Sequence, residues 1–279
     1  MSIQFPLEFS KMSGTGNDFI LIDHRTPFLS KEEMPSFARA VCERRVSVGA
    51  DGLILIEQSK VADFRWQFLN ADGSWAEMCG NGARCAARFA HARGIAPEQM
   101  RFETGAGIIE AQVRGQAVKL RMTAPTGLRL DEKLRVNGQE QVVHSLNTGV
   151  PHAVFFVKNI AQAPVLELGR SIRFHEHFQP AGTNVNFVQQ LGASALSVRT
   201  YERGVEGETL ACGTGAVAAA IIAGLLGQVQ PPVAVTTAGG EQLLIYYSLA
   251  GQEIAEVYLE GSVNFIYEGR LHEEAIKLS

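Results

Sequence analysis

The stretch AEMCGNGARCAARFA at residues 76–90 has a near copy in the same chain, TLACGTGAVAAAIIA at residues 209–223. Each copy contains a cysteine, a Gly-x-Gly-Ala turn and an alanine-rich apolar run. Glycine favours turns and alanine is the strongest helix former, so each copy predicts a turn that opens a helix. The sequence therefore predicts two helices that begin in the same way, after Cys79 and after Cys212.

The repeat extends beyond these two stretches. An Asn leads into an apolar, Phe-containing run both in GTGNDFILID at 14–23 and in AGTNVNFVQQ at 181–190. Downstream, Thr104 follows Cys79 by 25 residues (104 − 79), and Thr237 follows Cys212 by 25 residues (237 − 212). A solenoid has units of about 20 to 50 residues, whereas this longer repeat indicates two similar domains related by a pseudo-twofold axis.

Short β-type runs alternate with a few helical stretches, which indicates the α+β class. The strand candidates are GLILIE at 52–57, FRWQFLN at 64–70, AVKLRM at 117–122, HAVFFV at 152–157 and EVYLEG at 256–261. The helix candidates are 31–45, 82–93, part of 159–177, and 215–226. The polar segment 125–141 is the predicted linker. It divides the chain into domains at 1–125 and 126–279, and the last strand is a candidate to return to the first domain.

Composition limits the kind of partner. The 279 residues are 46% hydrophobic and 19% charged, and 25 Lys and Arg against 29 Asp and Glu leave a net charge of −4. Without a dense basic cluster we expect no nucleic acid and no membrane partner, which favours a small-molecule substrate. Without a signal segment or an apolar run of about 20 residues we expect a cytoplasmic protein. FHEH at 174–177 lacks a third ligand, so we expect no metal site.

The thiols of the repeated stretches stand where a helix begins. Unpaired backbone N–H groups and the positive end of the helix dipole favour a thiolate there, and they also favour a bound carboxylate. If the two helix ends face one another, Cys79 and Cys212 flank one anionic group. That arrangement suits removal of a proton from the carbon beside a carboxylate on one face and its return on the other. Two such bases would invert a stereocentre.

Other interpretations of these residues stay open at this stage. A lone cysteine among apolar residues is usually a buried structural thiol, the interpretation we keep for Cys42 and Cys85. GTGAVA at 213–218 fits the pattern G-x-G-x-x-A, but neither a buried strand nor the required acidic residue accompanies it. A regulatory disulfide between Cys79 and Cys212 is a non-enzymatic alternative, although it would not require the glycine turns. Because no CxxC pattern occurs, reduced thiols are expected.

Motifs along nearly the whole chain resemble the diaminopimelate epimerase family. They are KMSGTGNDFILID, RRVSVGADGLILIE, FLNADGSWAEMCGNGARCAARF, GVPHAVFFV, GTNVNFVQ and YERGVEGETLACGTGAVAA. The resemblance implies two similar domains, each a mixed, mostly antiparallel sheet around a central helix, with the active site in the cleft between them. It also implies a homodimer that interconverts LL- and meso-diaminopimelate without a cofactor, on the route to lysine and peptidoglycan.

The resemblance also implies roles for individual residues. Cys79 and Cys212 are the acid/base thiols, and His152 and Glu202 tune them. The turns after the two cysteines hold the reacting carboxylate, while Glu202 and Arg203 meet the substrate's ammonium and distal carboxylate. The implied substrate-binding set is Asn17, Asn70, Gly80, Asn81, Asn184, Glu202, Arg203, Gly213 and Thr214.

Two positions depart from the family's pattern. Val150 in GVPH stands where many members have an Asn that contacts substrate, and Asn147 is the candidate replacement. Gly52 in GADGL stands where some members have Gln. The distal end of the substrate site is therefore less well defined than the reacting end. A cofactor-independent racemase or isomerase of another amino acid stays the nearest alternative.

Overall fold

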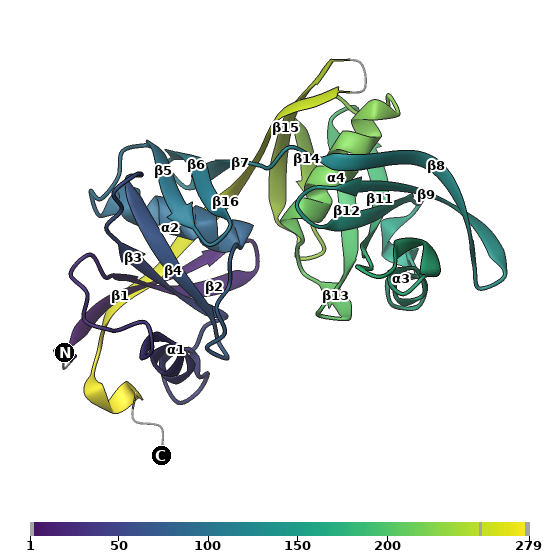
Figure 1. Ribbon diagram of the computed structural model, residues 1–279. Coiled ribbons are helices and arrows are strands. Elements are labelled where there is room, and N and C mark those ends of the chain that lie inside the picture. The colour runs from purple at the N-terminus through teal and green to yellow at the C-terminus, as the bar shows by residue number, and fades with distance from the viewer. Residues whose placement is uncertain (1–2, 251–252, 277–279) are drawn as a thin grey trace. The chain divides into compact units, whose positions relative to one another are not determined.

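The protein divides into two compact units. A computed structural model describes residues 3–250 and 253–276. The first unit consists of Met1–Leu120 and Gly261–Ser279, and the second unit is Arg121–Glu260 (Figure 1). The chain therefore enters the second unit once and returns to the first within its final strand.

The first unit is a mixed sheet with one helix on each face. Its helices are α1 (Met34–Cys42) and α2 (Gly80–Ala92). Its strands are β1 (Leu7–Gly14), β2 (Asn17–Asp23), β3 (Gly52–Glu57), β4 (Phe64–Asn70), β5 (Gln99–Thr104), β6 (Gly107–Arg114), β7 (Ala117–Arg121) and the last part of β16 (Glu253–Leu271). β1 to β7 lie in sequence order, and β16 pairs with β1. The pairs β2–β3 and β4–β5 are parallel, and α1 and α2 are the connections that join them.

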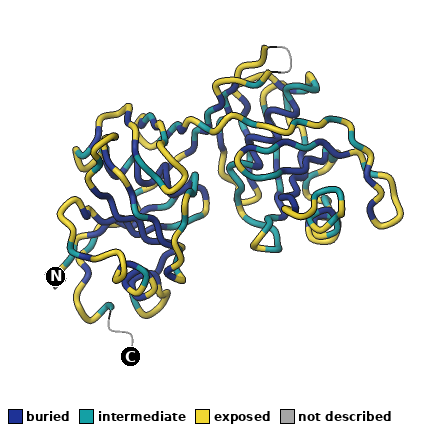
Figure 2. Tube along the Cα trace, viewed as in Figure 1, coloured by how far each residue is buried: buried dark blue, intermediate teal, exposed yellow. Residues whose placement is uncertain are grey.

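Strand β3 shows how both faces of this sheet are covered. All six of its residues are buried (Figure 2). Ile54 and Ile56 pack in the cluster that contains α2, whereas Leu53 and Leu55 pack in the cluster that contains α1. Successive side chains point to opposite faces, so a strand covered on both sides becomes a continuous apolar run.

The second unit is built in the same way. Its helices are α3 (Val165–Arg173) and α4 (Gly213–Leu225), with short 3₁₀ helices η1 (Ile160–Gln162) and η2 (Glu176–Phe178); η3 (Glu273–Ile276) follows β16 in the first unit. Its strands are β8 (Thr126–Val136), β9 (Gln139–Asn147), β10 (Pro151–Phe156), β11 (Asn184–Gly192), β12 (Ala195–Glu202), β13 (Gly207–Thr209), β14 (Val233–Thr236), β15 (Gln242–Ala250) and the first part of β16. The pairs β10–β11 and β12–β14 are parallel. Helix α4 packs against β9 to β12, β14 and β15, and its residues 215–223 are all buried.

The two units repeat one order of elements. The series β2-α1-β3-β4-α2-β5-β6 corresponds to β10-α3-β11-β12-α4-β14-β15, with parallel pairs at the same places. This arrangement confirms the predicted α+β class, with a mixed sheet around a central helix in each unit. It also corrects the comparison of the stretches that begin at Asn17 and Asn184, which are one strand apart in the repeat and not equivalent. The counterpart of β2 is β10, and the counterpart of β11 is β3.

The predicted linker at 125–141 is wrong. Residues 126–136 form β8, which turns at Asn137 and Gly138, both with positive φ, and pairs with β9. Most of its polar residues occupy exposed positions of the strand, while Leu134 and Val136 are buried. A strand with one exposed face alternates polar and apolar residues, and its polar residues resemble those of a linker.

Candidate active site

Both repeated cysteines cap a helix. Cys79 is the N-cap of α2, with φ −146° and ψ 118°, and its Sγ accepts the Gly82 N–H at 3.5 Å. Cys212 is the N-cap of α4, with φ −129° and ψ 105°. Both thiols are half-buried, whereas Cys42 and Cys85 are buried. The expected position of the two thiols at helix N-termini is therefore confirmed, and each helix begins two residues earlier than predicted because its first glycine is already helical.

Amide side chains surround the Cys79 turn in the first unit. Asn81 Nδ2 donates to Asn17 Oδ1 at 2.7 Å, and the fully buried Arg84 donates from Nη2 to Asn81 Oδ1 and Thr15 Oγ1, both at 2.7 Å. A guanidinium is effectively always charged, so α2 carries a buried positive charge five residues after Cys79 (84 − 79). This part of the first unit favours an anion.

The other predicted amide of the first unit lies at the same sheet edge. Asn70 ends β4 opposite Gly52 of β3, and Asn17 begins β2 beside that strand. Asn70 Nδ2 donates to Ser74 Oγ at 2.9 Å, and Asn17 Nδ2 donates to Asp51 Oδ2 at 2.9 Å. Asn17 thus contacts Asn81 directly, whereas Asn70 is held within its own turn.

The Cys212 turn lies near a negative charge, that of Glu202, whereas α2 carries the positive charge of Arg84. Its Sγ lies 3.6 Å from Thr214 Oγ1, and Thr148 Oγ1 donates to the Thr214 carbonyl at 3.0 Å. Burial and the negative charge of Glu202 raise the pKa of the Cys212 thiol to about 11, against the opposing effect of hydrogen bonds from Thr214 and the Gly215 N–H. Cys212 is therefore protonated at neutral pH.

The remaining predicted residues of the second unit share one sheet edge. Asn184 begins β11 opposite the end of β12, where its Oδ1 accepts the Arg203 N–H at 2.8 Å and its Nδ2 donates to the Pro151 carbonyl at 3.2 Å. Glu202 Oε2 accepts the Thr209 hydroxyl at 2.7 Å, and Arg203 Nη1 donates to the Ala181 carbonyl at 2.9 Å. Asn184 thus ties the Glu202–Arg203 turn to β10.

Two residues near His152 lie outside the predicted site: Asn186 contacts the imidazole, and Thr200 holds Asn186. This imidazole is only 1% exposed, and Asn186 Nδ2 lies 3.1 Å from its Nδ1. Thr200 Oγ1 in turn donates to Asn186 Oδ1 at 2.9 Å. Burial, and to a smaller extent the charge of Arg203, lower the pKa of His152 to about 3, so the ring is neutral at physiological pH. A signal was present in NVNFV, where an Asn occupies a position that strand alternation turns inward.

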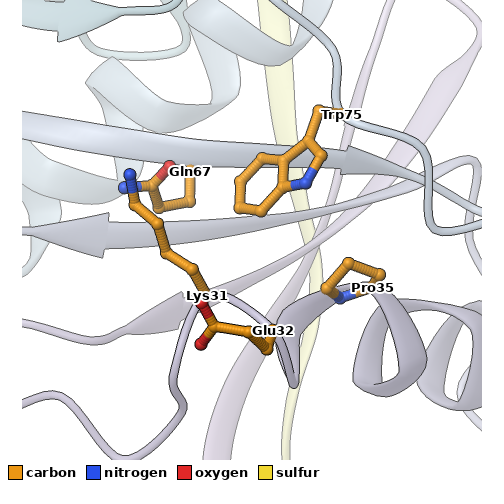
Figure 3. A pocket seen from close by; sticks show the side chains of 5 residues that line it. All are labelled: Lys31, Glu32, Pro35, Gln67 and Trp75. Carbon is orange, nitrogen blue, oxygen red and sulfur yellow. The ribbon is translucent and has the colours of Figure 1, made fainter.

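A surface pocket in each unit is lined mostly by residues outside these turns. A pocket of about 470 Å³ beside β4 and α1 is lined by Lys31, Glu32, Pro35, Gln67 and Trp75 (Figure 3). This lining contains neither a thiol nor a predicted site residue. A smaller pocket of about 160 Å³ in the second unit includes Asn147 and His152 in its lining.

The part of the chain that the structure describes has neither a metal-binding cluster nor a membrane-spanning helix. Residues 3–250 and 253–276 contain no group of three or more His, Cys, Asp and Glu side chains placed to hold a metal ion. Within the same ranges, no helix is long and apolar enough to cross a membrane.

A sequence profile of diaminopimelate epimerase matches residues 9–127 and 144–266. The chain belongs to the diaminopimelate epimerase family. It is 51% identical to a diaminopimelate epimerase of Aquifex aeolicus, over 97% of this chain and all of that protein. It is 46% identical to a diaminopimelate epimerase of Chlorobaculum tepidum, over 93% of this chain and 99% of that protein.

The fold of this chain is also similar to solved structures of low sequence identity. A phenazine biosynthesis protein of the PhzF family from Bacillus anthracis aligns with a TM-score of 0.70 at 16% identity, over 96% of this chain and 99% of that one. A hydroxyproline epimerase from Agrobacterium vitis aligns with a TM-score of 0.64 at 15% identity, over 98% of this chain and 94% of that one. These proteins share the fold of the diaminopimelate epimerase family.

The structure shows what surrounds Val150 and Gly52, the two positions that depart from the family's pattern. Asn147 Oδ1 accepts the Gly149 N–H at 3.0 Å and so closes the turn before Val150; whether Asn147 replaces the missing Asn contact stays a prediction. A Cβ at Gly52 would lie 2.7 Å from the Phe68 ring and 2.8 Å from the Leu69 carbonyl oxygen. A side chain at position 52 therefore requires β3 and β4 to shift.

Gly52→Ala is expected to lower the free energy of unfolding by about 1–3 kcal/mol, the usual cost of overpacking. Urea denaturation followed by circular dichroism measures this change. Gly192→Ala is the matched control in a strand, because its Cβ would meet the Ala195 Cβ at an ordinary 4.0 Å. Equal stability of the two variants would show that β3 and β4 adjust freely.

Proposed function

We propose that this chain interconverts LL- and meso-diaminopimelate with Cys79 and Cys212 as its two acid/base thiols. The family assignment supports the reaction, which belongs to lysine biosynthesis and, in this proposal, to peptidoglycan precursors as well. One observation carries the assignment of the thiols. Each caps a central helix at a Gly-x-Gly turn, at the same place in the two repeated units. A packing role alone gives no reason for that coincidence.

The proposed reaction moves one proton off the substrate and another on. A thiolate takes the proton from the α-carbon, so a C–H bond breaks and an S–H bond forms. The other thiol delivers its proton to the opposite face, so an S–H bond breaks and a C–H bond forms. The turns at Gly80 and Asn81 and at Gly213 and Thr214 supply backbone N–H groups for the carboxylate, which gains negative charge as the first proton leaves. The atoms balance without a co-reactant.

The surroundings of the two thiols favour different protonation states. Cys212 has a raised pKa and is a thiol at neutral pH, which suits a proton donor. The α2 N-terminus and the buried charge of Arg84 favour a thiolate at Cys79, which suits a base. We assign Cys79 as the base and Cys212 as the acid of the free enzyme. The roles reverse after each turnover.

The other predicted residues complete the proposed site. His152 and Glu202 tune the thiols, and Asn17, Asn70 and Asn184 hold the substrate's polar groups. Arg203 meets the distal carboxylate, because a guanidinium fork matches a carboxylate well. The proposal also includes a homodimer, which light scattering coupled to size-exclusion chromatography tests.

Glu202→Gln is expected to lower the pKa of Cys212, because it removes the negative charge that disfavours the thiolate. Alkylation of Cys212 by iodoacetamide, followed by mass spectrometry across a pH series, should then reach its half-maximal rate at a lower pH. Glu208→Gln is the control, since Glu208 pairs with Arg199 at 2.6 Å and is not among the groups that act on Cys212. An unchanged midpoint in Glu202→Gln would contradict the electrostatic account.

Proton exchange tests the proposed function as a whole. Purified, reduced protein in deuterated water, with LL-diaminopimelate and no added cofactor, should incorporate deuterium at the α-carbon as the meso form appears in the NMR spectrum. Lysine is the matched substrate, because it lacks only the distal carboxylate. Exchange on lysine but not on diaminopimelate would keep the two-thiol chemistry and overturn the substrate. No exchange on either would overturn both.

A further inference from the structure

The positions beneath the two helix N-termini are apolar in one unit and polar in the other. The matching registers of β2–β3–β4 and β10–β11–β12 identify three equivalent positions in each unit. They hold Phe19, Ile54 and Phe68 in the first unit and His152, Asn186 and Thr200 in the second. Each of the polar residues is at most 3% exposed. Burial of polar groups costs free energy unless they are hydrogen-bonded, so the difference between the units calls for a physical reason.

The hydrogen bonds of Asn186 fix the orientation of its amide. Nδ2 donates to the Ala153 carbonyl at 3.1 Å, and Oδ1 accepts the Thr200 hydroxyl at 2.9 Å. The reverse orientation would place the amide oxygen against the Ala153 carbonyl oxygen. The second proton of Nδ2 therefore points to His152 Nδ1, 3.1 Å away. A carbonyl oxygen can only accept, so this orientation follows from the surroundings of the amide.

The orientation of Asn186 determines which nitrogen of His152 carries the proton. Because Nδ1 accepts a hydrogen bond, the proton of the neutral ring lies on Nε2. Among the described residues Nε2 has no hydrogen-bond partner, although it is fully buried. Such an N–H can donate to an anion, but it cannot take a proton from a thiol. Histidine in this state is a fixed donor and not a general base.

We propose that Asn186, held by Thr200, is a positioning residue that locks His152 as the neutral Nε2–H tautomer, so that His152 donates a hydrogen bond to an anion of the reaction. The inference rests on the proposed function for the identity of that anion, either a cysteine thiolate or the substrate's carboxylate. Both are anionic acceptors, and a donor stabilises either of them. The apolar trio of the first unit cannot supply such a donor.

Nitrogen-15 NMR of the imidazole rings tests the tautomer without substrate. In the wild-type protein the signals lost in His152→Gln should show a protonated Nε2 and an unprotonated Nδ1. His24 is the internal reference with the opposite tautomer. Its Nε2 accepts from the Phe28 and Leu29 N–H groups at 3.0 and 3.1 Å, so Nδ1 carries the proton that is donated to Glu57. A wild-type His152 protonated on Nδ1, or on both nitrogens, would overturn the proposal.

Two variants connect the tautomer to catalysis. Asn186→Asp places a carboxylate oxygen beside Nδ1, so the proton should move there, and kcat should fall about ten- to a hundredfold, as for the loss of a charge-assisted hydrogen bond. Gln189→Glu puts the same charge on β11 but away from His152, and should leave the His152 signals unchanged.

If Asn186→Asp does not fold, Thr200→Val provides a second test. It frees the Asn186 amide and should give a mixture of tautomers, which Thr200→Ser should not give. A loss of activity with the proton still on Nε2 would reduce Asn186 to a structural role and overturn the proposal.

The source of the anion is found from the Nε2–H proton resonance. A shift on addition of meso-diaminopimelate to thiol-alkylated protein identifies the carboxylate, and a shift on raising the pH of the free enzyme, absent after alkylation, identifies a thiolate. No shift in either experiment would overturn the assignment of an anionic partner. A protein with the expected tautomer that does not epimerise diaminopimelate would contradict the proposed function alone.

Discussion

Replacing either Cys79 or Cys212 by alanine is expected to reduce epimerisation by at least about a thousandfold, within the range for loss of a positioned acid or base. Each variant loses one of the two proton carriers, so inversion at the α-carbon cannot be completed. The measurement is the appearance of meso-diaminopimelate from the LL form by NMR in deuterated water. Cys42→Ala is the control, because that thiol is buried in the α1 core and its pKa is raised to about 12.

The single-thiol variants also separate the two faces of the substrate. The thiol that remains can still take the α-proton of one stereoisomer and return a deuteron to the same face. Cys79→Ala and Cys212→Ala should therefore exchange the α-proton of opposite epimers, slowly and with retention of configuration. Exchange of the same epimer by both variants would contradict the assignment of one thiol to each face. Full activity of either variant would contradict the two-thiol mechanism.

The parts of the fold predicted from sequence are those with a local cause. The glycine turns at Cys79 and Cys212 and the alanine-rich runs after them specify helices by themselves, and β3 and β4 were bounded correctly because their apolar runs end at turn residues. The strand β8 was missed because only one face of it is buried, and its exposed residues resemble a linker. Its pairing with β9 depends on contacts that no short window contains.

In the candidate site, too, only the features with a local cause are predictable from the sequence. Cysteines next to glycine turns are recognisable because the chemistry of a helix N-terminus is local. Asn186 reaches His152, and Thr200 reaches Asn186, only through strand pairing, across 34 and 14 positions of the chain respectively (186 − 152 and 200 − 186). The internal repeat relates these residues to the first unit, but only the pairing of the parallel strands shows that β11 is equivalent to β3. Asn184 and Gly52 are then equivalent, as are Glu202 and Asn70.

Gly215→Ala is expected to impair both stability and activity, whereas the equivalent Gly82→Ala is expected to be tolerated. Each glycine stands three residues after its cysteine, in the first turn of α4 or α2. A Cβ at Gly215 would overlap Asn186 Oδ1 and lie 3.2 Å from the Cys212 Sγ. Because three hydrogen bonds hold the Asn186 amide, it cannot yield without releasing His152, Thr200 or the Ala153 carbonyl.

A Cβ at Gly82 meets the flexible end of Ile54 at 3.3 Å, which can move by a few tenths of an ångström. Alanine also favours a helix by about 1 kcal/mol over glycine, so the two effects offset one another at Gly82. At Gly215 we expect a loss of about 1–3 kcal/mol in the free energy of unfolding, as for overpacking. Displacement of Cys212 and His152 should lower kcat about a hundredfold as well, the usual effect of a misplacement near 1 Å.

Urea denaturation and the exchange assay on both variants measure these differences. Gly215→Ala combined with Asn186→Ala is the decisive third variant, because the smaller side chain makes room for the new methyl group. Its loss of stability should be less than the sum of the two single losses, since neighbouring residues that compete for one space are coupled. Strict additivity, or equal tolerance of alanine at Gly82 and Gly215, would contradict the inference that Asn186 fills the space beneath the Cys212 turn.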